Sequence, residues 1–228
     1  MSVLHQLRRT ARIAGGIARD RGASYRLARA AIEHHSALQR TWELMSLVRE
    51  VRRLRPRVVV EVGTHRGGTL FCWAAAAAPD ARLVSIDLPT PDQGMGTREG
   101  DEARFRAFLR PGQRLDCLHR DSHAPETRDE LLRLLDGRAV DFLWIDGDHS
   151  AAGVRADWAL YGPLVRPGGL IAFHDIHPNP ALPGNQVTPL WRELRARYTH
   201  REYVDQDHPG GVGMGIGVLV QPQRGAAS

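Results

Sequence analysis

The sequence of 228 residues predicts an α/β fold, in which helices cover both faces of a mostly parallel, seven-stranded sheet. From Arg57 onward, short apolar runs alternate with stretches of helical length, which is the pattern of consecutive βαβ units. Each of the first five runs also ends in a glycine or a polar cluster. Ligands bind at this carboxyl edge in open α/β sheets, so we expect the functional residues there.

The elements can be placed in order along the chain. Five parallel strands and two closing strands are expected at Val58–Val62, Leu83–Ile86, Leu115–Leu118, Val140–Ile145, Leu170–Phe173, Arg201–Val204 and Ile216–Val220. The helices that connect or follow them are expected at Thr69–Ala78, Asp101–Leu109, Pro125–Leu135, Ala151–Leu164 and Gln186–Tyr198. Residues 57–222 then form one domain and residues 223–228 a tail.

Residues 1–56 are expected to form a basic helical arm or lid. Residues 1–57 hold 13 arginines against four acidic residues, a net charge of +9, whereas residues 58–228 carry −4. Such an arm can bind nucleic acid, a membrane surface or another subunit. We expect it to pack on the acidic body or on a second copy of the chain, which makes a homo-oligomer one expected form.

Within the arm, Val3–Arg19 is weakly amphipathic, a turn is expected at residues 21–23, and Ser24–Arg55 is expected to form one or two helices ended by Pro56. An apolar stripe at three- and four-residue steps is expected to face a buried partner. Its members are Leu38, Trp42, Met45, Val48 and Val51.

Composition excludes several classes of protein. Hydrophobic residues make up 42% of the chain and charged residues 25%, as in ordinary globular proteins, which excludes disorder throughout. No run of 18 uncharged apolar residues occurs, so a membrane span is not expected. The two cysteines, Cys72 and Cys117, are expected to be reduced and buried. No signal peptide is recognisable, which predicts a cytoplasmic location.

Three strand ends carry residues suited to a nucleoside-containing ligand. The run from Glu61 to Thr69 has the form E-x-G-x-x-x-G, with Gly63, Gly67 and Gly68 between a strand and a helix. Glycines there allow close approach of a ligand to the backbone, but the spacing differs from the G-x-G-x-x-G of dinucleotide sites. Asp87 can accept both hydroxyls of a ribose, or cap a helix. Asp121 and Ser122 can edge an adenine ring, or form a capping turn.

The fourth and fifth strand ends combine acids with histidines. Asp146 and His149 follow the fourth strand, and His174 and Asp175 follow the fifth. Because adjacent parallel strands end side by side, Asp146, His174 and Asp175 are expected to converge and could share one divalent ion. His174 and Asp175 could equally form hydrogen bonds within the site without a metal. His149 is expected to face the same crevice, as a base or as a surface residue near a helix start.

Taken together, this series of motifs resembles class I S-adenosylmethionine-dependent methyltransferases, and within them the cephalosporin hydroxylase-like and macrocin-type O-methyltransferase branch. The resemblance runs from about Trp42 to Val220. It implies a Rossmann-like fold and methyl transfer to a hydroxyl of a small-molecule acceptor. It also implies that the methionine part of the cofactor is held by Gly63, Thr64, Gly67 and Gly68.

Further roles are implied by the same resemblance. Glu61 would support the cofactor loop, Asp87 would hold the ribose hydroxyls, and Asp121 and Ser122 would contact adenine. Asp146 would lie at the cofactor as well as at the metal. Metal-dependent relatives place acidic or amide ligands at the positions of Asp146, His174 and Asp175, and a catalytic base at the position of His149. The implied cation is Mg²⁺ or Mn²⁺, and the imidazole of His174 favours the less oxygen-selective ions.

Two other classes of activity fit parts of the sequence. An NAD-dependent oxidoreductase would also use an acid like Asp87, but the glycine spacing and the I-D-G-D-H cluster count against it. A nucleic-acid methyltransferase or binding protein would use the basic arm, but the sequence has no N-P-P-Y-type signature and only 6% aromatic residues. A family member without methyl transfer remains compatible with the sequence.

Overall fold

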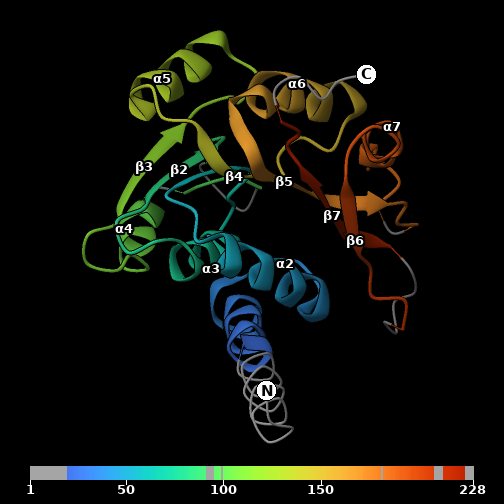
Figure 1. The fold of residues 1–228 in the computed structure, drawn as a ribbon, viewed down its shortest axis with the longest axis horizontal. Coiled ribbons are helices and arrows are strands. Elements are labelled where there is room, and N and C mark those ends of the chain that lie inside the picture. Colours follow the sequence, from blue (N-terminus) through green and yellow to red (C-terminus); the bar gives the residue numbers. More distant parts are fainter. Residues whose placement is uncertain (1–19, 91–94, 99, 181, 208–212, 224–228) are drawn as a thin grey trace, which may run out of the picture.

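The computed structural model describes residues 20–90, 95–98, 100–180, 182–207 and 213–223. Within them, seven strands form one sheet in the order β3-β2-β1-β4-β5-β7-β6 (Figure 1). The strands are β1 (Val58–Val62), β2 (Arg82–Asp87), β3 (Arg114–His119), β4 (Val140–Ile145), β5 (Val165–His177), β6 (His200–Tyr203) and β7 (Met214–Val220). The predicted number of strands is therefore confirmed.

Pairing in the sheet is mostly parallel, as predicted. Strands β1 to β5 pair in parallel with one another, whereas β7 pairs antiparallel with both β5 and β6. The strand order reverses between β1 and β4, whose last residues Val62 and Ile145 are register partners. The loops after these two strands consequently open beside each other, which is where ligands bind in such sheets.

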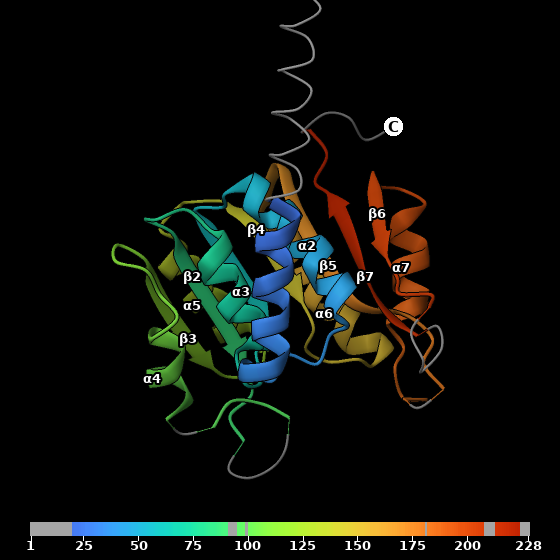
Figure 2. The same cartoon turned by 90° about the horizontal axis from the view of Figure 1, so that it is seen from below.

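Helices cover both faces of the sheet, which confirms the predicted fold class (Figures 1 and 2). On one face lie α2 (Thr41–Leu54), α3 (Gly68–Ala76) and α4 (Asp101–Arg106), and on the other lie α5 (Pro125–Leu135), α6 (Ala151–Tyr161) and α7 (Val187–Arg195). A single 3₁₀ turn, η1 (Gly162–Leu164), follows α6. Each set of helices closes its own hydrophobic core against the sheet.

The valine run of β1 explains why that strand is buried on both sides. All five residues of β1 are buried. Val59 belongs to the core under α2 and α3, whereas Val58, Val60 and Val62 belong to the core under α5 and α6. Side chains alternate along a strand, so a strand covered on both faces buries every side chain. Four of these side chains in β1 are valines, and Glu61 is the fifth.

The N-terminal arm differs from the prediction in two respects. The expected turn at residues 21–23 is wrong, because residues 20–35 are helical and bury Ala28 and Ala31 completely. Tertiary packing of this kind overrides the weak helix propensity of one glycine. Of the expected apolar stripe, Leu38 and Trp42 are 56% and 47% exposed. Val48 and Val51 of the stripe are buried as expected, and Leu44 and Leu47, with Glu43, complete the buried face of α2.

Several element boundaries also differ. Helix α2 ends at Leu54, close to the expected stop at Pro56. Helix α4 ends at Arg106 rather than Leu109, and β5 extends from Val165 to His177, well beyond the expected Leu170–Phe173. Val3–Arg19 and residues 224–228 lie outside the described residues. Every helix of the described part of the chain is too short or too polar to span a bilayer.

Candidate active site at the carboxyl edge of the sheet

Two loops meet where β1 and β4 end. Gly63, directly after β1, has a φ of +84°, and a Cβ atom there would lie 2.1 Å from the carbonyl oxygen of Asp146. Gly67 has a φ of +79°, and a Cβ there would lie 2.4 Å from the ring of Phe105. Contacts inside the protein are therefore enough to require glycine at both positions. A Cβ on Gly68 would likewise lie 2.4 Å from the backbone nitrogen of Ala37.

Glu61 lies beneath this loop and is completely buried. Its carboxylate accepts hydrogen bonds from the hydroxyls of Thr64 and Thr69, at 3.0 and 2.5 Å, and from the indole N–H of Trp73 at 2.9 Å. Burial nevertheless raises the pKa of Glu61 to about 8, although these three donors oppose the rise. Glu61 thus connects Thr64 of the loop after β1 with Thr69 and Trp73 of helix α3.

Asp87, the last residue of β2, has its carboxylate in the same region. Its Oδ2 accepts the backbone N–H of His65 at 2.7 Å and the hydroxyl of Thr97 at 3.1 Å. Its Oδ1 accepts the N–H of Leu88 at 2.9 Å. Burial raises the pKa of Asp87, and the hydrogen bonds counteract this. The backbone N–H of Thr64 is a further donor towards this carboxylate, so four donors within the protein hold it in place.

Asp121 and Ser122 form the turn that precedes α5. Asp121 is exposed, and its Oδ1 accepts the backbone N–H of His123 at 2.9 Å. The hydroxyl of Tyr161 donates to the carbonyl oxygen of Ser122. These contacts stabilise the turn, but α5 has no side-chain cap, and the role of the two residues towards adenine stays a prediction.

The four acids and histidines after β4 and in β5 lie together. His149 Nε2 is 3.3 Å from Asp146 Oδ1 and 3.4 Å from Asp175 Oδ2. His174 Nδ1 is 3.2 Å from Asp146 Oδ1 and 3.6 Å from Asp175 Oδ1. Each imidazole therefore lies between the same two carboxylates. His174 and Asp175 are almost fully buried, whereas the side chain of His149 is 37% exposed.

A β-bulge allows His174 and Asp175 to share this cluster. Consecutive residues of a regular strand point to opposite faces of the sheet. The pairing of β5 with β7 shifts register between His174 and His177, and Asp175 has a φ of +57°. Aspartate tolerates this left-handed conformation better than most residues, and bulges re-aim side chains beside active sites. Adjacency of strand ends alone would not have brought both side chains to Asp146.

The charges of the cluster support one another. Burial opposes ionisation of Asp146, but His174 and His149 outweigh it and lower its pKa. Burial also opposes the charged form of His174, yet Asp146, Asp175 and Glu43 together raise its pKa to about 9. The hydrogen bond to Asp146 raises the pKa of His149, whereas burial raises that of Asp175. The cluster therefore holds a positive charge between two carboxylates in the absence of a metal.

Sequence reasoning missed two contributors, Gln39 and Glu43. The side-chain Nε2 of Gln39 donates to Asp146 Oδ2 at 2.8 Å, from the segment that joins the two N-terminal helices. Glu43, fully buried on α2, accepts the backbone N–H of Asp205 at 2.8 Å and faces the same cluster. Neither residue lies near a strand end, so no signal in the sequence pointed to them. The arm consequently contributes directly to the site.

The donor atoms of this cluster fit a divalent cation. Asp146, His149 and Asp175 each offer one ligand atom, and these atoms lie within 4.8 Å of one another. Asp175 Oδ1 and His174 Nε2 are buried without a hydrogen-bond partner among the described residues. Carboxylate oxygens and imidazole nitrogens together suit Mn²⁺, Fe²⁺, Co²⁺ or Zn²⁺ as well as Mg²⁺. Which three of the four side chains would serve as ligands stays a prediction.

A groove of about 420 Å³ elsewhere on the arm is less suited to chemistry. It lies between the helix of residues 20–35, α2 and β6, and three of its four charged residues are paired, Arg49 and Arg53 with Asp20 and Glu50 with Arg201. It also lacks a cluster of acids and histidines, and its residues are Arg21, Trp42, Met45, Ser46, Arg49, Glu50, Arg53 and Tyr203.

Comparison with solved structures shows the shared fold. An O-methyltransferase from Bacillus cereus, in complex with SAH, has a TM-score of 0.58 and 16% identity over 89% of this chain and 90% of its own. The O-methyltransferase TomG from Streptomyces achromogenes, in complex with SAM, has a TM-score of 0.58 and 19% identity over 87% and 89% of the two chains. The MycE methyltransferase of the mycinamycin biosynthetic pathway, in complex with Mg and SAH, has a TM-score of 0.58 and 18% identity over 90% and 56%.

Comparison with known sequences shows the family. Uncharacterized protein y4gI of Sinorhizobium fredii is 32% identical over 156 residues, which are 64% of this chain but only 16% of that protein. This chain therefore spans a small part of that relative. The profile of the family described as "Methyltransferase domain" matches residues 60–176, which include the loop after β1, Asp87 and the cluster on β4 and β5. The chain thus belongs to the family described as "Methyltransferase domain".

Proposed function

We propose that this chain transfers a methyl group from S-adenosylmethionine to a hydroxyl oxygen of a small molecule, with His149 as the base. The observation that carries the proposal is the cluster of Asp146, His149, His174 and Asp175, which places a partly exposed imidazole among buried carboxylates. It lies at the strand reversal of a methyltransferase fold. We also propose that the chain is a member of the cephalosporin hydroxylase-like and macrocin-type O-methyltransferase branch.

The residues after β1 and β2 fit the proposed cofactor. The loop from Gly63 to Gly67 holds its backbone in left-handed conformations at both glycines, and Asp87 ends β2, where a carboxylate can meet a ribose hydroxyl. Glu61 supports this loop from below, as its three hydrogen bonds indicate. When bound, S-adenosylmethionine supplies a methyl group on a sulfonium sulfur, which is already activated towards a nucleophile. The chain's task is then mainly positioning, which can supply about 7–11 kcal/mol.

His149 is suited to hold or accept the proton of the acceptor hydroxyl. Its Nε2 lies within 3.4 Å of both Asp146 and Asp175, so the ring is oriented by two carboxylates, yet its side chain remains partly exposed to a ligand. General-base catalysis of this kind contributes about 10²–10⁴-fold. His174 is buried and positively charged at neutral pH, because its pKa is about 9, so it stabilises the cluster rather than serving as the base.

A divalent cation could take over the role of that positive charge. Asp146 and Asp175, with His174 or His149, would hold it, and it would supply a Lewis acid that stabilises the deprotonated acceptor oxygen. The MycE methyltransferase, which shares the fold, was solved in complex with Mg, and this supports the proposal of a cation. His174 would have to lose its proton in order to bind a metal, which favours Mn²⁺ or a similar ion over Mg²⁺.

A small-molecule acceptor fits better than a nucleic acid. The arginines of α2 that face the preceding helix are occupied, since Arg49, Arg52 and Arg53 all lie within 3.7 Å of the carboxylate of Asp20. Nucleic-acid binding needs arginines that can reach the phosphates and displace the counterions condensed on the nucleic acid. The names of the neighbours from Bacillus cereus and Streptomyces achromogenes, both O-methyltransferases, support the same acceptor class.

The test combines binding with product detection. We expect calorimetry to show binding of S-adenosylmethionine and of its demethylated product, and none of NAD. Incubation with methyl-deuterated S-adenosylmethionine, a small-molecule extract and Mn²⁺ or EDTA should yield a deuterium-labelled ether or ester. Exclusive labelling of nucleic acid or protein would overturn the small-molecule proposal, and full activity in EDTA would remove the metal but leave His149 as the base.

A further inference from the structure

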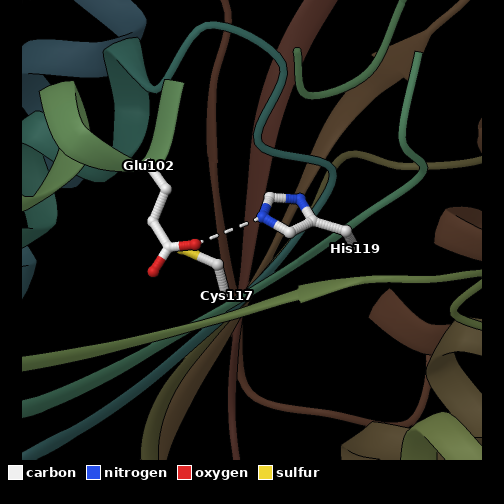
Figure 3. Close-up of side chains that lie close together, drawn as sticks. All are labelled: Glu102, Cys117 and His119. Atoms are coloured by element: carbon white, nitrogen blue, oxygen red, sulfur yellow. Dashed lines mark ion pairs between the residues drawn. The ribbon is translucent and has the colours of Figure 1, made fainter. Parts of the chain in front are cut away.

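A second group of metal-ligating side chains lies at the edge of the sheet formed by β3. Cys117 and His119 are two residues apart on β3, so they project from the same face of the strand, and Glu102 reaches them from α4 (Figure 3). Ligand atoms of the three residues lie within 4.8 Å of one another. Strand β3 is the edge of the sheet and pairs only with β2 in the described part of the chain.

The geometry of this group is close to that of a tetrahedral metal site. Glu102 Oε2 lies 3.5 Å from His119 Nε2. Around a tetrahedral Zn²⁺, nitrogen and oxygen ligands lie about 3.4 Å from each other, and a thiolate sulfur lies about 3.5 Å from either. The separation of the carboxylate and imidazole therefore already matches that of two ligands of one ion, and Cys117 needs only a small movement to complete the triad.

The carboxylate of Glu102 is held in a direction that suits this role. Arg106, one turn further along α4, donates from its Nε to Glu102 Oε1 at 3.1 Å, and its terminal nitrogen contacts the same oxygen. Oε2 is left to face His119. Side chains that occupy the second oxygen of a ligating carboxylate fix its orientation and commonly contribute to metal affinity.

We propose that Glu102, Cys117 and His119 form a binding site for a borderline-soft divalent cation, represented by Zn²⁺, that is separate from the cluster on β4 and β5. A cysteine sulfur and an imidazole select such ions over Mg²⁺ and Ca²⁺. On binding, the thiol of Cys117 releases its proton to solvent, and the thiolate and the carboxylate together balance the charge of the ion.

The surroundings favour a proton on Cys117 until a cation arrives. Burial, and then the charge of Glu102, raise the pKa of the Cys117 thiol to about 12. A bound divalent cation reverses that effect, because it stabilises the coordinated thiolate. Three protein ligands leave the fourth position to water, and His119 and Glu102 are partly exposed on that side. An ion could therefore enter without opening the fold.

The site also borders the proposed cofactor region. His119 is the register partner of Asp87, and Cys117 is the register partner of Ser85, on the neighbouring strand β2. An ion that ties α4 to the end of β3 therefore lies one strand away from the carboxylate proposed to hold the ribose. The proposal on the metal stands on its own residues and does not depend on methyl transfer.

Cobalt(II) substitution distinguishes this site from the other cluster. Co²⁺ added to EDTA-treated full-length protein should produce a thiolate-to-cobalt charge-transfer band that saturates with added Co²⁺ and is abolished by excess Zn²⁺. The cluster on β4 and β5 contains no sulfur, so the charge-transfer band reports only a cysteine site.

Variants assign the band to these residues. Cys117→Ser should lose it, and Glu102→Gln and His119→Gln should lower the apparent Co²⁺ affinity at least about tenfold. Cys72→Ala is the matched control, because Cys72 is the other cysteine, is fully buried, and lies in α3; it should keep the band. Circular dichroism spectra equal to that of the wild type show that each variant is folded. Absence of the band in the wild type, or its persistence in Cys117→Ser, would overturn the proposal.

Discussion

The two halves of the carboxyl edge of this sheet use their carboxylates in opposite ways. On β1 and β2, Glu61 and Asp87 are met by hydroxyls, an indole and backbone N–H groups, and burial raises the pKa of both. On β4 and β5, Asp146 and Asp175 are met by two imidazoles, one of which is charged at neutral pH. The first half is therefore built from neutral donors that shape a binding loop, and the second from groups that exchange charge.

This difference assigns separate duties to the two halves. Neutral donors around a carboxylate set its direction, which suits recognition of a polar ligand. Imidazoles between carboxylates can pass protons to and from a ligand, which suits proton transfer. Substitutions in the first half should then change affinity for the cofactor, and substitutions in the second half should change turnover.

The largest expected effect is that of His149→Gln. Loss of the base should lower turnover about 10²–10⁴-fold, while the affinity for S-adenosylhomocysteine stays within twofold of wild type. Labelled methyl transfer to the extract acceptor measures the first quantity and calorimetry the second. His200→Gln on β6 is a control that should alter neither. If cofactor affinity fell together with turnover, the two halves would not be separable.

The same residue predicts the direction of the pH dependence. The hydrogen bond to Asp146 raises the pKa of His149, so its neutral form is populated only above the ordinary value near 6.5. In EDTA, turnover should therefore rise with pH through a pKa above 6.5. A divalent cation bound by the two carboxylates favours the neutral imidazole, so its addition should shift this limb to lower pH. A limb that stays in place when the metal is added would argue against metal at this cluster.

Asp87→Ala should have the next largest effect. A hydrogen bond to a charged group is worth about 1.5–3 kcal/mol, so affinity for S-adenosylhomocysteine should fall about 10- to 100-fold. Saturating cofactor should restore most of the turnover. Asp80→Ala, which removes an exposed aspartate paired with Arg57, is the matched control and should leave affinity unchanged. An unaltered affinity in Asp87→Ala would remove this residue from the cofactor site.

A smaller effect concerns stability and Glu61. Its folded pKa is about 8 against an ordinary value of 4.5, so its contribution to stability is present below pH about 4.5 and is lost as pH rises towards 8. The melting temperature of the wild type should consequently fall with pH over this range more steeply than that of Glu61→Gln. Glu126→Gln at the start of α5 should retain the wild-type slope. Parallel curves for wild type and Glu61→Gln would show that Glu61 is ionised throughout.

Gln39→Ala should have the smallest effect. It removes the hydrogen bond to Asp146 Oδ2 but leaves Oδ1 with both histidines. Turnover should fall less than about tenfold, because one hydrogen bond usually contributes about 0.5–1.5 kcal/mol of free energy. Cofactor affinity should not change. Leu38→Ala, an exposed neighbour on the same segment, serves as the control. A change confined to cofactor affinity would place Gln39 with the first half instead.

Much of the fold could be predicted because it depends on local patterns. Apolar runs covered on both faces, such as Val58–Val62, specify parallel strands, and their polar ends specify the edge where ligands bind. Proximity of Asp146 to the residues of β5 follows from strand adjacency. These inferences needed no knowledge of packing between distant segments.

What could not be predicted depends on long-range packing. Gln39 reaches Asp146 across 107 residues of sequence, and no periodicity marks it. The bulge that turns Asp175 towards the cluster is a property of the pairing with β7. The stripe was wrong at Leu38, which lies in the segment before α2, and at Trp42, in the first turn of α2, but right at Val48 and Val51, because the way α2 packs on the core decides which of its residues are buried.

The position of β7 between β5 and β6 has a consequence for synthesis of the chain. When β5 leaves the ribosome, the strand that will pair with its outer edge has not yet been made, because β7 follows α7 and β6 in the chain. That edge includes Ile171 and Phe173, which are completely or almost completely buried in the finished fold. Unpaired apolar edges recruit other chains. Fragments that end after residue 176, the limit of the family match, should therefore aggregate, whereas those that extend through Val220 should remain dispersed.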